Sequence, residues 1–425
     1  MTLSSPHAEA PAGNAFRTAN PHALATILEA AETRRIIAAT DIFAIDGTKL
    51  WASQKPVSAS LQRKLMDRQL RAPLESCLVA EDGVTAATLG QDLQALVASD
   101  SPLAPLLRVH APRLVREAAH VPLHPVAQLL LSAAQSARPD TYHHAVAAMA
   151  LAGALSAANG GDVREIRTAM LCGLLHDLGE MYIAPQYGEA EADRALDILS
   201  YRQLVVHPHV GYLLVHQLTD YPGVVARAVA EHHERLDGSG YPHALTGDAM
   251  SPLGRLLAVT EAALGAMHGP FGHLMHASVA LRAVPGEFDL RWVGFVSRAA
   301  NQQPPLQPVM EPADIHARLS ALDAVLHAAE RNVAAAASCA KAPTLQGALA
   351  LAGFMVERLR AGWNESGLWT LHVSSGAEAA EVEALEDAIY FRLRAVQRAM
   401  QLHAGELPAD EAAALQALGD SLAMS

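Results

Sequence analysis

Helical periodicity is the feature that most constrains how this chain can fold. From Pro122 to about Arg298, apolar residues recur at helical spacing in successive short segments separated by glycine and proline breaks. Aromatic residues make up only 4% of the chain, and Ala and Leu are abundant. Because Ala and Leu favour helices, we predict a mainly α protein. The helices expected in the central region are 122–136, 141–157, 163–176, 202–218, 221–233, 252–267 and 273–283.

Changes in composition divide the 425 residues into several units. Near the N-terminus, residues 23–39 are expected to be helical. Residues 42–51 are expected to form a hairpin whose type I′ turn is Asp46-Gly47. After the central region, the helices expected are 312–340, 344–362, 377–403 and 408–423. The predicted units are a disordered tail (1–20), a small α+β N-terminal domain (21–120), an all-α helical bundle (121–300), a proline-rich linker (301–308) and a helical C-terminal region (309–425).

Charge, cysteine usage and hydropathy exclude several classes of protein. The net charge of −13 argues against binding to a nucleic acid polymer, which depends on Lys and Arg. The three cysteines are isolated, as suits a reducing compartment. The N-terminus lacks the pattern of a signal peptide, and the longest apolar run, Ala145–Ala158, is too short to span a bilayer. We therefore expect a cytoplasmic protein without a membrane segment.

Histidines and acids in the central region are arranged as metal ligands would be. Adjacent residues on a helix point about 100° apart, so a His-Asp or His-His pair reaches two ions rather than clamping one. Asp177 has two oxygens and can bridge such ions. Two pairs on separate helices would frame a dinuclear centre that activates water for attack on phosphorus. A buried polar cluster without metal is the alternative. The residues concerned are His144, His176, Asp177, His207, His232, His233 and Glu261.

A glycine-rich stretch follows the histidine pair at 232–233. Gly238 and Gly240 permit close approach of the backbone to a ligand, and Tyr241 can contact a base or a phosphate. The same residues could instead form a structural turn that only fixes the preceding helix. For Asp237 we expect a structural role, holding this loop by hydrogen bonds.

Three motifs in this region resemble the HD-GYP family, a branch of the HD phosphohydrolases. They are HDLG at 176–179, HPHVG at 207–211 and HHERLDGSGYP at 232–242. The resemblance covers roughly residues 122–300. It implies an all-α domain with two or three divalent ions, Fe or Mn above all. It also implies hydrolysis of cyclic di-GMP to pGpG or GMP in bacterial signalling.

Carried over residue by residue, the resemblance assigns roles within the site. His176 and Asp177 would be catalytic, and all seven residues named above would bind metal. The spacing to His176 favours His144 over His143 as a ligand. Asp140 could reach a third metal or cap its helix. Substrate would contact Gly240, Tyr241, Pro242 and Arg255.

This chain departs from the family pattern at three positions. Glu180 replaces the lysine of HDxGK, Glu261 stands where the last metal ligand is usually Asp, and Gly269 replaces an arginine expected to bind phosphate. A degenerate regulatory module that binds nucleotide or protein partners without hydrolysis therefore stays open as the alternative. The partners considered are a cyclic dinucleotide or related phosphate ester, signalling proteins and a second copy of the chain.

Overall fold

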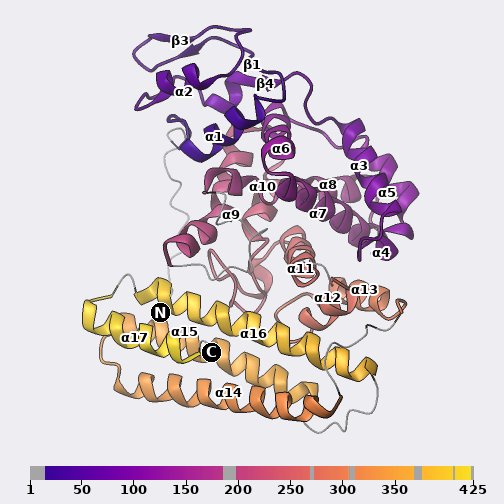
Figure 1. Cartoon of the computed structure of the whole chain (residues 1–425), viewed down its shortest axis with the longest axis vertical. Coiled ribbons are helices and arrows are strands. Elements are labelled where there is room, and N and C mark those ends of the chain that lie inside the picture. Colours follow the sequence, from indigo (N-terminus) through magenta and orange to yellow (C-terminus); the bar gives the residue numbers. More distant parts are fainter. Residues whose placement is uncertain are drawn as a thin grey trace.

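The prediction of a mainly helical chain is confirmed. The structure, a computed structural model, describes residues 15–184, 198–268, 272–304, 306, 312–367, 376–404 and 407–422. A small N-terminal unit lies at one end of the molecule, the central helices follow, and four long C-terminal helices form a layer at the other end (Figure 1). The linker predicted at 301–308 and the tail predicted at 1–20 lie partly outside the described residues.

The N-terminal unit combines short helices with two small antiparallel strand pairs. Strand β1 pairs with β4, and β2 pairs with β3. The elements are α1 (Pro21–Ala30), β1 (Ile36–Ala38), β2 (Ile42–Phe43), β3 (Lys49–Trp51), α2 (Ala59–Leu65), η1 (Leu74–Cys77), β4 (Leu78–Ala80), α3 (Ala86–Ala98), α4 (Ala104–Arg108) and α5 (Ala111–Ala118).

Two local predictions in this unit were wrong in detail. The helix expected over 23–39 ends at Ala30, because the buried, β-branched Ile36 and Ile37 pair with β4. The hairpin at 42–51 forms, but only Gly47 within its turn has a positive φ, of 88°. The turn therefore has three residues, closed by the bond from the Ala44 amide to the Thr48 carbonyl at 2.9 Å.

The central helices match the predicted segments closely, and one helix, α13, was not predicted. Helices α6, α8, α11, α12 and α13 begin at a residue whose side chain caps the helix. In α8, for example, Asp162 and Glu165 form a reciprocal capping box. The elements are α6 (Pro125–Ala137), α7 (Pro139–Ala158), α8 (Val163–Leu175), η2 (Leu178–Tyr182), α9 (Ile198–Leu218), α10 (Gly223–Glu231), η5 (Gly247–Ala249), α11 (Pro252–Ala266), α12 (Leu274–Ala280) and α13 (Leu290–Ala300).

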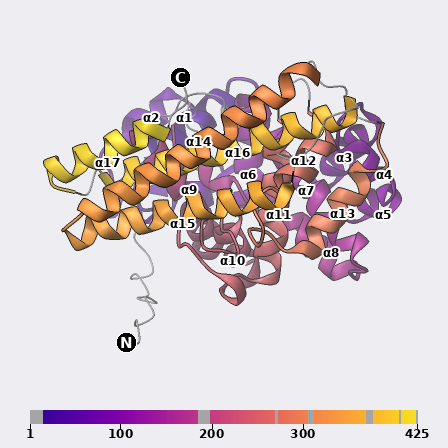
Figure 2. The same cartoon turned by 90° about the horizontal axis from the view of Figure 1, so that it is seen from below.

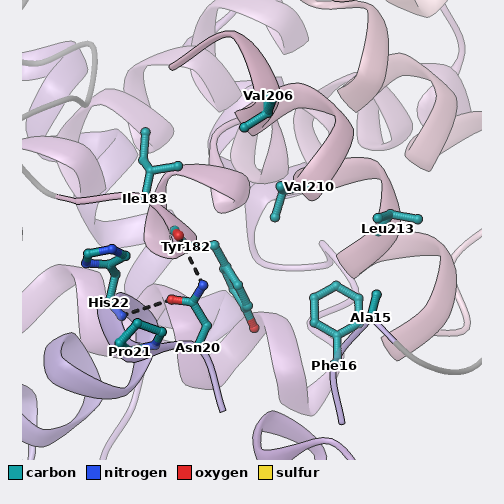
Figure 3. A pocket seen from close by; sticks show the side chains of 10 residues that line it. All are labelled: Ala15, Phe16, Asn20, Pro21, His22, Tyr182, Ile183, Val206, Val210 and Leu213. Atoms are coloured by element: carbon teal, nitrogen blue, oxygen red, sulfur yellow. Dashed lines mark hydrogen bonds between the residues drawn. The ribbon is translucent and has the colours of Figure 1, made fainter. Parts of the chain in front are cut away.

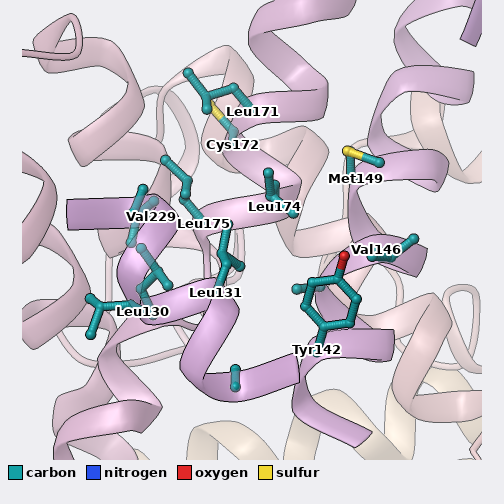
Figure 4. Packing of buried hydrophobic residues seen from close by; sticks show 14 of the residues in the cluster. Leu130, Leu131, Tyr142, Val146, Met149, Leu171, Cys172, Leu174, Leu175 and Val229 are labelled. Atoms are coloured by element: carbon teal, nitrogen blue, oxygen red, sulfur yellow. The ribbon is translucent and has the colours of Figure 1, made fainter. Parts of the chain in front are cut away.

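Helices α6, α7, α8 and α10 pack around the centre of the core. Figure 4 shows side chains such as Leu131, Met149 and Leu175 from these helices meeting in one cluster. Helix α7 is buried along most of its length, which fits its Ala- and Gly-rich sequence. The buried cluster runs from Phe16 to Ala300, so the N-terminal unit and the central helices share one hydrophobic core.

The C-terminal helices form a second core. They are α14 (Pro312–Cys339), α15 (Pro343–Ser366), α16 (Gly376–Ala404) and α17 (Ala409–Leu422), and they lie across one face of the molecule (Figure 2). Their buried residues also enclose Val279, Ala283 and Val284 from the end of the central region. None of the described helices is long and apolar enough to cross a membrane.

A pocket of about 410 Å³ lies between the N-terminal segment and the central helices (Figure 3). Phe16 meets the ring of Tyr182 edge to face, with ring centres 5.7 Å apart. The Asn20 side-chain amide donates to the Tyr182 carbonyl at 3.1 Å. These contacts fix η2, the short helix that directly follows Asp177.

Candidate metal centre

The structure brings all seven predicted ligand residues together from the ends and inner faces of five helices. His144 lies near the start of α7, and Glu261 lies in α11. The HD pair ends α8, and the HH pair ends α10. Two groups of ligand atoms result, each within 4.8 Å. They are His144, His176, Asp177 and Glu261, and Asp177, His207, His232 and His233.

Asp177 belongs to both groups through different oxygens. Its Oδ1 lies 3.4 Å from His207 Nε2 and 3.3 Å from His232 Nε2. Its Oδ2 lies 3.3 Å from His144 Nε2 and 3.2 Å from His176 Nε2. This is the arrangement of a carboxylate that can bridge two ions.

Hydrogen bonds to backbone carbonyls orient three of the imidazoles. The Nδ1 atoms of His176, His207 and His232 lie 2.7, 2.6 and 2.6 Å from the carbonyl oxygens of Gly173, Leu204 and Val229. A carbonyl can only accept, so each Nδ1 carries a proton, and a neutral ring keeps its lone pair on Nε2. Together with His144, these are the rings whose Nε2 atoms face Asp177.

The crowding of ring nitrogens fits a bound cation. His207 Nε2 and His232 Nε2 are 3.0 Å apart, and His144 Nε2 and His176 Nε2 are 3.2 Å apart. In the His207–His232 pair both Nδ1 atoms carry the proton, so the two Nε2 lone pairs face each other and repel, whereas a metal ion would accept both. Imidazole and carboxylate donors without cysteine suit Fe, Mn, Ni or Zn, and the set does not choose among them. The residues present therefore fit a metal centre.

Burial and mutual charge shape the protonation of the site. Burial lowers the pKa of His232 to about 4, which keeps it a neutral ligand. Burial would also lower the pKa of His144, but the carboxylates of Glu261 and Asp177 raise it to about 10. Burial opposes ionisation of Asp177, yet the surrounding imidazoles, His176 first, hold its pKa well below the usual range. The carboxylate is therefore charged and available to a cation.

Close backbone packing sets the distance between the two groups. A Cβ at Gly179 would lie 2.0 Å from the carbonyl oxygen of His207 and 2.8 Å from the Gly211 amide. Glycine at 179 thus lets η2 lie directly against α9. This contact brings the His176–Asp177 pair next to His207.

The glycine-rich loop turns back onto the HH pair. A Cβ at Gly240 would lie 2.4 Å from the Arg235 amide nitrogen and 2.5 Å from the His233 carbonyl oxygen, so only glycine fits. The Tyr241 ring stacks on His233, with ring centres 4.6 Å apart. Asp237 accepts hydrogen bonds from the amide and hydroxyl of Ser239 at 3.0 and 2.7 Å, consistent with the structural role expected for it.

Sequence reasoning missed the role of Glu234. Its side chain is fully buried, and its two oxygens accept from the amides of His243 and Leu245 at 2.6 and 2.8 Å. Burial raises the pKa of this carboxyl group, and these amides oppose the rise. Glu234 therefore holds the exit of the loop. Its position within HHERLDG was the signal available.

The remaining predicted residues lie around the centre. The Arg255 guanidinium donates to the Gly247 carbonyl at 2.9 Å and to Asp248 at 3.0 Å, so it ties α11 to η5, and its role in substrate binding stays a prediction. Asp140 lies in the first turn of α7, and His143 lies one turn later. Both are exposed, and neither belongs to a ligand group. Gly269 lies outside the described residues.

Glu180, the acid that replaces the family's lysine, is buried at the edge of the centre. Burial lowers the pKa of His144 and of His207, and the nearby carboxylates raise it. The negative charge of Glu180 adds to this rise in the pKa of both histidines. Its backbone carbonyl accepts from Arg138 Nη1 at 3.0 Å. With glutamate in place of lysine at this position, the charge beside the centre is two units more negative than the HDxGK motif implies.

Comparison with known proteins gives a consistent picture. Residues 103–284 match the family model of the HD domain. A cyclic di-GMP phosphodiesterase of Pseudomonas aeruginosa is 33% identical over 153 residues, 36% of this chain and 36% of that protein. A cyclic di-GMP phosphodiesterase response regulator of Xanthomonas campestris is 32% identical over 112 residues, 26% of this chain and 29% of that protein.

Two further proteins are more distant. A 3′3′-cGAMP-specific phosphodiesterase of Vibrio cholerae is 30% identical over 90 residues, 21% of this chain and 18% of that protein. A solved HD-GYP-type protein from Bdellovibrio bacteriovorus is 14% identical. The match covers 64% of this chain and 96% of that chain, with a TM-score of 0.35. The chain spans about a third of the length of the first curated relatives it matches.

Proposed function

We propose that this chain, whose residues 103–284 match the HD domain, belongs to the HD-GYP family and is a metal-dependent phosphodiesterase. Its proposed reaction is hydrolysis of cyclic di-GMP to pGpG or GMP. The single observation that supports this most is the position of Asp177, whose two oxygens face two separate groups of imidazoles. The names of the relatives, cyclic dinucleotide phosphodiesterases, support the substrate class.

We assign the two ligand groups to two divalent ions, with Fe or Mn as the expected metals. Ions held there would supply Lewis-acid stabilisation of the phosphoryl group and a more acidic water. Asp177 would connect the two groups. The carbonyl-bonded imidazoles of His176, His207 and His232 would keep their Nε2 lone pairs aimed at the centre without reorganisation.

The glycine-rich loop is the proposed wall of the substrate site. Tyr241 is held by its stacking on His233, so its ring edge and hydroxyl have a defined position beside the ligand group. Gly240 lets the chain turn back tightly onto the backbone of residues 233–235, which places Tyr241 there. Together with Pro242, these residues would contact a base or sugar, and Arg255 would add positive charge near the start of α11.

Glu180 favours a second candidate function, binding without hydrolysis. Two unit charges about 10 Å apart interact by about 1.7 kcal/mol at an effective dielectric of 20. A buried carboxylate near the centre therefore opposes the approach of a phosphate that the family's lysine would attract. A protein that binds metal and nucleotide but hydrolyses the nucleotide slowly would have this combination of metal ligands and a buried acid.

The test compares hydrolysis with metal content in the full chain. Protein loaded with Mn²⁺, or with Fe²⁺ without oxygen, is incubated with cyclic di-GMP, and pGpG and GMP are separated by chromatography. We expect product from the wild type and from Asp140→Ala, whose exposed carboxylate lies outside both groups, and none from Asp177→Ala. Metal-loaded wild type that forms no product but binds cyclic di-GMP in calorimetry would refute the enzyme and support the second candidate.

A further inference from the structure

Two arginines of the C-terminal helices reach toward the loop that follows the HH pair. The first, Arg392 of α16, bonds Glu287 with Nε at 3.0 Å and with Nη2 at 2.5 Å. Its Nη2 also donates to the Ala280 carbonyl at 2.7 Å. The side chains of Arg392 and Glu287 are only 13% and 8% exposed, so water screens this ion pair little.

Glu287 passes this contact on to the loop by two routes. Its backbone carbonyl accepts from the Leu236 amide at 3.0 Å. Its Oε1 lies 3.7 Å from Nε of Arg235, which also lies over the Phe288 ring at 4.8 Å. Leu236 and Arg235 lie within the HHERLDGSGYP motif, so α16 is linked to the loop through one buried residue, Glu287.

The second arginine, Arg358 of α15, faces the loop directly. Its Nε lies 3.7 Å from Oδ2 of Asp237, while Oδ1 of Asp237 accepts the two bonds from Ser239. Both Arg358 Nε and Asp237 Oδ2 are buried atoms that make no hydrogen bond within the described structure. The opposite charge is therefore the compensation that each has for leaving water.

These contacts lead to the wall of the candidate site. Asp237 and Leu236 precede Gly240, where the chain turns back so closely that the Tyr241 amide donates to the His233 carbonyl at 3.1 Å. A displacement at 236–237 would therefore be transmitted to the ring that stacks on a ligand histidine. The C-terminal helices lie outside the segment that matches the HD domain, residues 103–284.

We propose that Arg358 and Arg392 are positioning residues of the candidate active site, supplied by the C-terminal helices to hold the loop at 235–241. The proposal rests on the proposed function for its catalytic consequence, but not for its structural one. It makes the C-terminal layer a part of the site. Any partner or signal that loosened α15 or α16 from the central helices would thereby change the position of Tyr241.

Simple packing between the two cores is the competing explanation, and a second, more exposed ion pair at the same interface distinguishes it from the proposal. Arg282 of the central region and Glu381 of α16 lie 3.6 Å apart at the same interface, and both are about half exposed. Neither contacts the loop in any described interaction. If the arginines only glue two cores together, Arg282→Ala should have the same effect on the loop as Arg358→Ala.

Hydrogen exchange on the full chain, with and without Mn²⁺, measures the loop directly. The probes are the amides of Leu236, Gly238 and Tyr241, each of which has a backbone acceptor. We expect exchange to be on the order of tenfold faster in Arg358→Ala and in Arg392→Ala, and unchanged in Arg282→Ala. Arg358→Lys, which keeps the charge, should recover most of the protection. Equal exchange in Arg358→Ala and wild type would overturn the proposal.

Kinetics give the second readout. Misplacing a substrate contact by about 1 Å can cost on the order of 10²-fold in rate. We therefore expect kcat/KM for cyclic di-GMP to fall 10- to 100-fold in Arg358→Ala, with metal content unchanged and partial rescue by lysine. Faster loop exchange without loss of kcat/KM would remove the catalytic part of the proposal. If the wild type proves inactive, the proposed function fails, while hydrogen exchange still decides the positioning role. If Arg358→Ala does not fold, Arg358→Gln takes its place in both assays.

Discussion

Replacing Asp177 with asparagine should remove most of the stability that divalent metal gives this protein. The substitution keeps the shape of the side chain and one oxygen acceptor, but it removes the negative charge. Because Oδ1 faces one group of imidazoles and Oδ2 faces the other, a single change affects both groups. Loss of a ligand from only one group would affect one ion.

The size of the effect follows from linkage. A metal at about 100 times its dissociation constant stabilises the folded state by about 2.7 kcal/mol per site, or about 5.4 kcal/mol for two. A ligand change that weakens each site about 100-fold leaves about 0.4 kcal/mol per site at the same concentration. The metal-dependent stabilisation should fall by about 4.6 kcal/mol, equivalent to a change of roughly 5 °C in the Tm of a chain of 425 residues.

Thermal unfolding of the full chain in EDTA and in Mn²⁺ measures this difference, with bound metal counted on the same samples. Asp140→Asn, an exposed acid in the first turn of α7, is the control and should keep the whole shift. An asparagine variant at 177 that retains two metal equivalents and the full rise in Tm would refute a bridging role for this carboxylate.

Three further outcomes are expected. Glu180→Gln should raise kcat/KM for cyclic di-GMP on the order of tenfold in steady-state assays. The reason is that a negative charge about 10 Å from a phosphate repels it by about 1.7 kcal/mol at an effective dielectric of 20. An unchanged kcat/KM would mean that Glu180 does not face substrate. Gly179→Ala should lower the free energy of urea unfolding by about 3 kcal/mol, since its Cβ would meet the α9 backbone at 2.0 Å, whereas Gly265→Ala, with nothing within 4 Å, should change it by less than about 1 kcal/mol. Burial raises the pKa of Glu75 above its ordinary 4.5, so its contribution to stability is complete below pH 4.5 and is lost as pH rises through the folded-state pKa. As the pH rises from 4.5 to 7, the unfolding free energy of Glu75→Gln should therefore increase relative to that of the wild type, by at most about 1.4 kcal/mol per pH unit. A difference between the two proteins that does not change with pH would contradict this.

Local chemistry explains why so much of the helical frame could be predicted. Capping residues and glycine or proline breaks lie within a few residues of the helix ends they define, as Asp162 and Glu165 do for α8. The hairpin turn and the end of α1 were harder. At the end of α1, pairing with strand β4, about 40 residues further along the chain, decided the conformation of Ile36 and Ile37.

The candidate ligands could also be predicted, because a dinuclear centre needs a particular set of donor atoms in a particular order. Glu234 was missed because a buried acid in a motif has no distinctive chemistry until its amide partners are known. Helix α13 was missed although Asp289 caps it, because it lies just before the expected linker.

By itself, the sequence indicated the helices, the candidate donor set and the resemblance to the HD-GYP family, since helical periodicity and ligand type are properties of short segments. Only the tertiary structure decided that the two oxygens of Asp177 divide between two groups, and that Arg392 reaches Glu287. Glu261 lies 117 residues from His144, and Arg392 lies 105 residues from Glu287. Contacts over such separations depend on how whole helices pack, and backbone approaches like that at Gly179 determine that packing.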